Sequence, residues 1–255
     1  MGRNSAGQPL LAADYTEGPV HPALAHHVVC TWINPARAPS HAVLPDACMD
    51  IIWDGAHLLV AGPDTGPVDV DTRATVVGIR FRPGAASGIL GLPASELRDR
   101  RVPLAAIWGR TADELAERLA DAPRLASELL ERAVLARLPS ATPVDPLVAE
   151  VFRELAGSRA RGGAIHVLAR RLAVDERTLR RRCAHGLGYG PKTLDRILRF
   201  RRALCLGRVG LPLAAVAVAA GYADQAHMNR ECRRLAGAAP GTLFGGGAVV
   251  ISTNG

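Results

Sequence analysis

The sequence is poor in cysteine and in aromatic residues, and it has no long apolar run. Its five cysteines are scattered and form no CxxC pair, which argues against a disulfide framework and against a zinc finger. The longest apolar run, Leu211–Ala220, is too short to cross a bilayer, and the chain does not open with a secretory leader. These absences predict a reduced, cytoplasmic protein with no membrane partner.

Motifs of common enzyme classes are also missing. The chain contains no GxSxG, GxxxxGK[ST] or GxGxxG. Residues for a metal site in a β-barrel could be drawn only from the first part of the chain: His21, His26, His27, His41, His57, Cys30 and Cys48. They include no H-x-H followed by a glutamate and a distant histidine, so surface or core histidines are favoured. We therefore expect no catalytic residue, no metal ligand and no cofactor.

One cysteine stands among acidic residues. Cys48 lies between Asp46 and Asp50, two carboxylates that would raise its pKa rather than activate it as a nucleophile. A small, buried, apolar role is the default for such a thiol. Asp46, Asp50 and Asp54 are interpreted as residues that form hydrogen bonds in loops or at strand ends.

The chain is rich in arginine, which is unevenly distributed. Residues 151–245 contain 18 Lys and Arg against 6 Asp and Glu, a balance of +12. The rest of the chain holds 13 basic and 18 acidic residues, a balance of −5. An asymmetry of this size indicates that the basic half binds a polyanion.

A repeat lies within the basic half. Shifting the sequence by 49 positions places Asp175–Leu194 over Asp224–Leu243, with seven identities in 20 places. Each copy of such a repeat is normally one supersecondary unit. Each copy here begins with an aspartate that can cap a helix, and each keeps an apolar pair four residues apart. Both copies are therefore predicted to be helices of about three turns.

The composition and residue pattern of the sequence divide the chain into five segments. We expect a flexible N-terminus (1–18), a β-rich sensory or oligomerisation domain (19–138), a linker (139–145), a DNA-binding domain (146–245) and a flexible tail (246–255). Within the second segment, β-type runs over Leu24–Leu90 favour a small antiparallel sandwich or barrel. A helical pair over Thr111–Leu138 follows, with a capping box at Thr111 and Glu114 and a break at Pro123.

After the linker the sequence predicts helices alone. Their expected ranges are Pro146–Ala156, Ile165–Leu172, Glu176–His185, Pro191–Val209, Leu213–Ala220 and Gln225–Ala236. The fold class is thus α+β and multidomain: a small β sandwich or barrel with helices, then an all-α domain of two helix-turn-helix units joined by a long helix.

The helix-turn-helix prediction rests on an order of elements that occurs twice: a short helix is followed by a brief turn and then by a capped second helix. On a helical projection, Leu179 and Cys183 share one face of the first copy, as Met228 and Cys232 do in the second. The opposite faces offer arginine and amide side chains, which have the best geometric match to base edges in the major groove. The side chains assigned to these faces are Arg177, Arg180, Arg181, Gln225, Ala226, Asn229, Arg230 and Arg233. The helix over Pro191–Val209 would be the rod that holds the two units about 34 Å apart.

The last hundred residues resemble the DNA-binding domain of the AraC family of bacterial transcription regulators. The resemblance is carried by LARRLAVDERTLRRRCAHGLGYGPKTLDRILRFRRAL and LAAVAVAAGYADQAHMNRECRRLAGAAPGTL, including Gly221, Tyr222, Gln225 and Arg230. It implies sequence-specific binding of double-stranded promoter DNA, and it adds His227 to the base-contacting residues. Cys183 and Cys232 stand where the family usually has a buried phenylalanine, so smaller helix cores are expected.

The first half resembles, more weakly, a domain found before such DNA-binding domains. LPDACMDIIW, VAGPDT, GIRFRPGAA and ELRDRRVPLAAIWG carry this resemblance. It implies a small β-domain that senses a ligand or oligomerises, without naming the ligand. RNA polymerase and a small-molecule effector remain open as partners, and both monomer and homodimer remain open as states. Activation and repression are not distinguished.

Two other functions remain open at this point. The first alternative is a cupin-like, metal-dependent enzyme that carries a DNA-binding tail as an anchor. The second is a ligand-free interaction module that binds a partner through Thr111–Leu138. The predicted function is nevertheless a DNA-binding transcription regulator that is not an enzyme.

Overall fold

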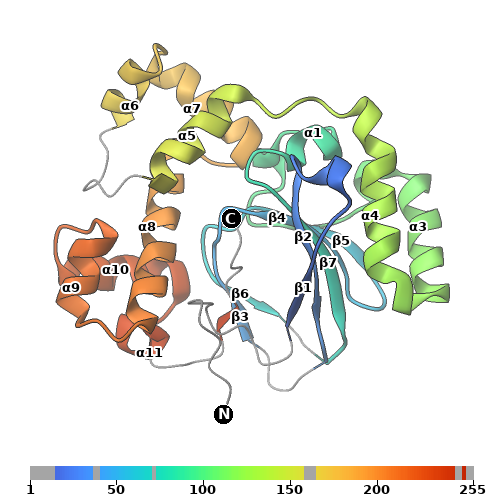
Figure 1. Ribbon diagram of the computed structural model, residues 1–255, viewed down its shortest axis with the longest axis horizontal. Helices are drawn as coiled ribbons and strands as arrows, with labels where there is room; N and C mark the ends of the chain where they lie inside the picture. The colour runs from blue at the N-terminus through green and yellow to red at the C-terminus, as the bar shows by residue number, and fades with distance from the viewer. Residues whose placement is uncertain (1–14, 37–40, 71–72, 158–164, 245–248, 251–255) are drawn as a thin grey trace.

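The computed structural model describes residues 15–36, 41–70, 73–157, 165–244 and 249–250. It forms a β-rich half and an all-helical half lying side by side (Figure 1). This arrangement confirms the predicted α+β class with an N-terminal β-domain and a C-terminal helical domain. No helix among these residues is long and apolar enough to span a membrane.

The β-domain contains two sheets. The larger sheet has the order β1-β2-β7-β4-β5-β8, with every neighbouring pair antiparallel. The smaller sheet has the order β6-β3-β9. The strands are β1 (Thr16–Gly18), β2 (Val28–Asn34), β3 (His41–Val43), β4 (Met49–Trp53), β5 (Leu58–Ala61), β6 (Val68–Val70), β7 (Val76–Phe81), β8 (Arg101–Pro103) and β9 (Val249–Val250).

The prediction of flexible segments at both ends of the chain is wrong in part, because each of these segments contains a strand. Thr16–Gly18, expected within a flexible N-terminus, pairs with β2 as an edge strand. Val249–Val250, expected within a flexible tail, pairs with β3 in parallel, so the C-terminal end of the chain completes the small sheet of the N-terminal domain. Residues 1–14, 245–248 and 251–255 lie outside the described residues. Both strands depend on partners distant in sequence, which a local pattern does not reveal.

Side-chain alternation explains the two faces of the large sheet. Because successive residues of a strand point to opposite faces, Val77, Ile79 and Phe81 of β7 enter one apolar core, while Arg80 lies on the other face. Gly78 also lies on that other face, where a Cβ would come within 2.3 Å of the Trp32 ring. The missing side chain therefore makes room for the indole.

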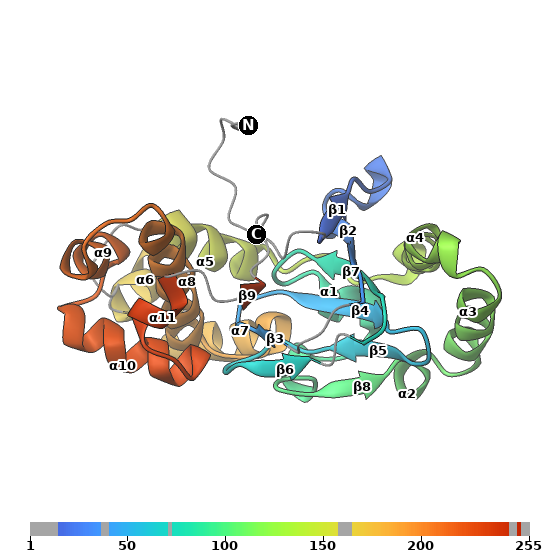
Figure 2. The same cartoon turned by 90° about the horizontal axis from the view of Figure 1, so that it is seen from below.

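Helices cover the first of these faces. α4 lies against β2 and β7, and the core beneath it includes residues of the other three helices. The helices are α1 (Ala86–Leu90), α2 (Ala105–Trp108), α3 (Arg110–Asp121) and α4 (Ala126–Arg137), and the short 3₁₀ turns are η1 (Pro22–Leu24), η2 (Ala94–Glu96), η3 (Pro123–Leu125) and η4 (Leu138–Ser140). Figure 2 shows α3 and α4 at the side of the molecule away from the helical half.

The predicted helical pair is confirmed, but its predicted cap is wrong. The break at Pro123 is real, since η3 starts there. The first helix begins at Arg110 with Gly109 as its N-cap, so Thr111 is already inside the helix and cannot cap it. Glu114 accepts a hydrogen bond from Arg110 Nε at 3.1 Å instead of closing a capping box.

All six helices predicted for the second half are present, with ends that differ by at most two residues. They are α5 (Pro146–Gly157), α6 (Ile165–Arg171), α7 (Glu176–Leu187), α8 (Pro191–Arg208), α9 (Leu213–Ala220) and α10 (Gln225–Ala236). A seventh, α11 (Pro240–Phe244), was missed because five residues carry too little periodicity. In Figure 1, α6 and α7 lie at one end of α8, and α9 and α10 lie at the other.

The two halves are joined by an apolar contact. Leu44 and Ala47 of the β-domain are buried in the same core as the helices of the second half. The predicted linker is packed onto the β-domain, since Thr142 N donates to Gly88 O at 3.3 Å. A Cβ at Gly88 would lie 2.1 Å from Thr142 O, so only glycine permits this close approach.

Candidate nucleic-acid interface

Each sequence repeat contains a capped helix, α7 or α10, and a short helix, α6 or α9, precedes it in the same unit. Asp175 Oδ1 accepts a hydrogen bond from Thr178 N at 2.8 Å, and Asp224 Oδ1 accepts one from His227 N at 2.6 Å. Both second helices end at a left-handed glycine, Gly188 and Gly237. The predicted caps are therefore confirmed, and the repeat is structural as well as sequential.

The inner faces of the two units are packed as the projection predicts. Leu179 and Cys183 of α7 and Met228 and Cys232 of α10 are fully buried. Burial raises the pKa of each of these two thiols to about 12, so both cysteines serve as neutral packing groups. Ala169 of α6 and Ala217 of α9 are also buried.

The outer faces carry the predicted reading residues. Seven of the nine have exposed side chains: Arg177, Arg180, Arg181, Gln225, Ala226, Arg230 and Arg233. His227 is half-buried, and its ring packs edge-on against Tyr222 with the ring centroids 5.3 Å apart. Asn229 is also half-buried, and its Oδ1 has no hydrogen-bond partner among the described residues. The structure thus leaves the arginines and Gln225 open to a partner, while His227 also supports the helix from below.

Several arginines counted in the basic half hold the protein together instead. Arg202 of α8 donates to the carbonyl of Ala220 at 3.1 Å and to those of Leu155 and Ala156 at 3.4 and 3.3 Å. These carbonyls belong to the C-terminal ends of α9 and α5, where a cation is favourable. One guanidinium therefore fixes two helices to the rod.

Repeat-equivalent positions 182 and 231 both form ion pairs. Arg182 Nε lies 2.6 Å from Asp145 Oδ2, which ties α7 to the start of α5. Glu231 Oε2 accepts from Arg196 Nε at 2.6 Å, which ties α10 to α8. The partners come from different elements, so sequence reasoning missed both pairs.

Comparisons with known proteins agree with this geometry. Residues 168–245, which include both capped helices, match the family described as "Helix-turn-helix domain". The chain carries an AraC-type helix-turn-helix domain. This match confirms the predicted DNA-binding transcription regulator. Residues 17–103 match a family described as a domain of unknown function.

Solved structures of ToxT from Vibrio cholerae are similar to the chain. An apo point variant from strain SCE256 has 12% identity and a TM-score of 0.45, with 84% of this chain and 97% of that one covered. The unsaturated fatty acid-bound wild type of the same strain has 12% identity and a TM-score of 0.46, with 86% and 95% covered. Among curated proteins, none matches the chain.

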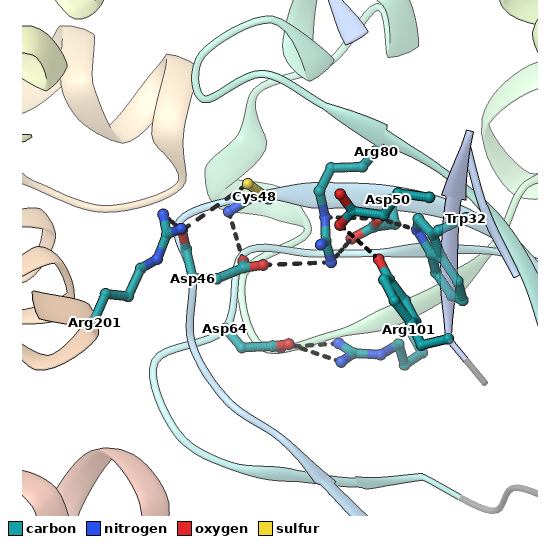
Figure 3. A network of polar contacts seen from close by, with 10 residues as sticks. Trp32, Asp46, Cys48, Asp50, Asp64, Arg80, Arg101 and Arg201 are labelled. Atoms are coloured by element: carbon teal, nitrogen blue, oxygen red, sulfur yellow. Dashed lines mark hydrogen bonds and ion pairs between the residues drawn. The ribbon is translucent and has the colours of Figure 1, made fainter. Parts of the chain in front are cut away.

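A second polar cluster lies in the β-domain, ahead of the AraC-type domain. Asp50 of β4 and Arg80 of β7 are paired in register and buried, with Arg80 Nε 3.1 Å from Asp50 Oδ1 (Figure 3). Trp32 Nε1 donates to Asp50 Oδ1 at 2.7 Å, and Asp46 Oδ2 lies 3.3 Å from Arg80 Nη2. Nearby, Arg101 Nη2 donates to Asp64 Oδ2 at 2.7 Å.

This cluster adds to the interpretation of the aspartates. Asp46 lies in the loop before β4 and accepts from Cys48 N at 2.9 Å, as expected, but Asp46 and Asp50 are also buried ion-pair partners of Arg80. Asp54 matches its prediction, since it accepts from the backbone of Ala56 and His57 in its own turn. Burial, together with Asp46, raises the pKa of the Cys48 thiol, as expected for a packing cysteine. Among the described residues, no three His, Cys, Asp or Glu side chains are grouped to hold a metal ion.

The cap of the second reading helix gives a first testable prediction. Asp224→Ala should lower the free energy of unfolding by about 1 kcal/mol, because the N–H of His227 loses its acceptor. Asp224→Asn keeps an acceptor oxygen and should cost much less. Urea denaturation of the two variants makes the comparison, and equal losses would show that the cap does not act through this bond.

Proposed function

We propose that the chain regulates transcription by placing α7 and α10 in two successive major grooves on one face of promoter DNA, under the control of its N-terminal β-domain. The observation that carries this proposal is the pair of equivalent capped helices, each with exposed arginine or amide side chains on the face opposite its core.

The chemistry of these side chains suits base reading. Arginine can bind guanine with two hydrogen bonds, and glutamine or asparagine can do the same with adenine. Arg180, Arg181 and Arg230 are assigned to base edges or nearby phosphates, and Gln225 in the first turn of α10 is assigned to an adenine. Arg233, one turn further on, is assigned to the DNA backbone.

The rod between the readers supports simultaneous binding. α8 contacts α5, α7, α9, α10 and α11, and Arg202 and Arg196 tie it to its neighbours. Because α7 and α10 both contact α8, the two reading helices would move as a single body. A separation of about 34 Å, one helical turn of DNA, is the spacing that this mode of binding requires.

The domain contact supports control by the β-domain. Arg201 Nη1 of α8 donates to the backbone carbonyl of Asp46 at 3.0 Å, while the side chain of Asp46 pairs with Arg80 in the β-domain (Figure 3). One residue therefore links the interior of the β-domain to the rod. A small molecule that shifts Arg80 or Asp46 would alter this link, which makes an effector-dependent change in DNA binding the expected behaviour.

The test begins with fragments of genomic DNA selected by the purified full-length chain. Affinity for the selected site should fall steeply with salt, because phosphate contacts release counterions. Arg230→Ala should weaken binding to that site by about 1–3 kcal/mol and relax the preference at one base position. Fluorescence anisotropy at fixed salt measures both effects.

A matched control separates base reading from general charge. Arg118 is exposed on α3 of the β-domain, so Arg118→Ala removes the same charge away from the reading faces. It should leave affinity for the selected site nearly unchanged. Equal losses in the two variants, or none in Arg230→Ala, would show that the assigned reading face is wrong.

A further inference from the structure

The β-domain contains a cavity between its two sheets. Its volume is about 290 Å³, close to the lower limit for sites that bind small organic molecules. Trp32 and Tyr15 form one side, with their rings stacked at 6.0 Å between centroids, and apolar residues such as Ile52 and Val76 extend this surface. The cavity therefore suits a small molecule with an aromatic or aliphatic body.

Two buried polar atoms at this cavity lack partners. Asn34 and Arg80 are each only 6% exposed and line the cavity. Asn34 Oδ1 and Arg80 Nη1 have no hydrogen-bond partner among the described residues. A buried polar group without a partner is costly, and native proteins rarely leave one unexplained. An acceptor such as Asn34 Oδ1 would be satisfied by a ligand that brings an N–H or O–H group.

The charged side chains around the cavity favour a ligand of one sign of charge. Among the described residues, five carboxylates and two guanidiniums, Arg80 and Arg101, line the cavity. The carboxylates are Asp46, Asp50, Asp54, Asp64 and Asp69. Arg80 pairs with Asp46 through Nη2 and with Asp50 through Nε, and Arg101 pairs with Asp64, so the described lining holds three more carboxylates than guanidiniums. Burial raises the pKa of Asp50, with a smaller contribution from Asp46, while Arg80 lowers it.

We infer that this cavity binds a small amine, in its protonated form, with an aromatic or aliphatic body. The ammonium group donates to Asn34 Oδ1 and offsets the excess carboxylate charge, and the body packs against Trp32 and Ile52. A carboxylic acid of the same size is excluded by repulsion from the aspartates. This inference rests on the proposed control by the β-domain, because it names the class of effector on which that control depends.

The experiment uses sets of ligands that share one body and differ in charge. The first set is 2-phenylethylamine, 2-phenylethanol and phenylacetate, and the second is hexylamine, hexanol and hexanoate. Isothermal titration calorimetry with the full-length chain at pH 7 and low salt should give an affinity for the amine at least tenfold above that for the alcohol. The carboxylate should not bind measurably.

A pair of matched variants locates the site. Asp69 lines the cavity and is exposed, so Asp69→Asn should fold normally and weaken amine binding about threefold. Asp113 is exposed on α3, away from the cavity, and Asp113→Asn should change nothing. The inference is overturned if all three members of a set bind equally, if the acid is preferred, or if neither amine binds at millimolar concentration. DNA binding is measured without amine, so these results do not bear on the proposed DNA reading, which has its own test.

Discussion

Replacing Arg80 by methionine should lower the free energy of unfolding by about 3–5 kcal/mol, the usual cost of removing one partner from a buried ion pair. Arg80 is the only guanidinium within ion-pair distance of both Asp46 and Asp50 among the described residues. Methionine fills much of the same volume, so the loss comes from two uncompensated carboxylates rather than from a cavity. Urea denaturation at pH 8 measures it.

The size of this loss should depend on pH. Burial raises the pKa of Asp50 in the folded protein, and Arg80 lowers it, so removing Arg80 should raise that pKa further. A folded carboxyl group with a raised pKa holds its proton where the unfolded chain, with a pKa of about 3.9, has lost it. Stability of the variant therefore falls as pH rises through this interval. The deficit relative to the parent protein should be smaller at pH 5 than at pH 8.

A second substitution distinguishes charge from packing in this variant. Arg80→Met combined with Asp50→Asn removes one of the two unpaired charges and should recover part of the lost stability. Trp32 Nε1 keeps an acceptor in the asparagine oxygen, so its hydrogen bond is not an added loss. A deficit that is independent of pH and unrelieved by the second change would mean that Arg80 contributes by packing alone.

The sequence was most informative where structure is local. The offset of 49 positions located both capped helices, and the spacing of Leu179 and Cys183 identified the buried face of the first. Helix periodicity, caps and turns act over a few residues, so one sequence is enough to reveal them. The capping box predicted at Thr111 was wrong even within this range, because the N-cap of α3 is Gly109, two residues earlier.

Contacts between residues distant in the chain could not be predicted from the sequence. Arg202 was counted only as one of the basic residues of the second half, although it binds the C-terminal carbonyls of α5 and α9, at Ala156 and Ala220, 46 and 18 positions away. Asp50 was interpreted as a simple hydrogen-bonding residue because its partner, Arg80, lies 30 positions away on a paired strand. Strand register places these two side chains together, and register is set by the whole sheet. The cavity has the same origin, since residues from both sheets line it.

Gly188→Ala should destabilise the folded protein by about 2–4 kcal/mol through the contact between the two domains. A Cβ at this position would lie 2.3 Å from Pro63 Cγ and 3.1 Å from Ala94 O, both in the β-domain. The proline ring cannot rotate away, so either the backbone shifts or the domains separate. The positive φ of 82° at Gly188 adds about 1–2 kcal/mol for any residue with a side chain.

The repeat supplies the control for this substitution. Gly237 is the equivalent residue of the second unit and also has a positive φ, 68°, but a Cβ there would meet only Pro67 Cγ, at 3.9 Å. Gly237→Ala should therefore carry the backbone cost without the collision, about 1–2 kcal/mol. Urea denaturation compares the two variants, and small-angle scattering should show a larger radius of gyration for Gly188→Ala alone. Equal losses and equal dimensions would mean that the β-domain does not rest on α7 in solution, and that the link from Asp46 to Arg201 is too weak to hold the domains together.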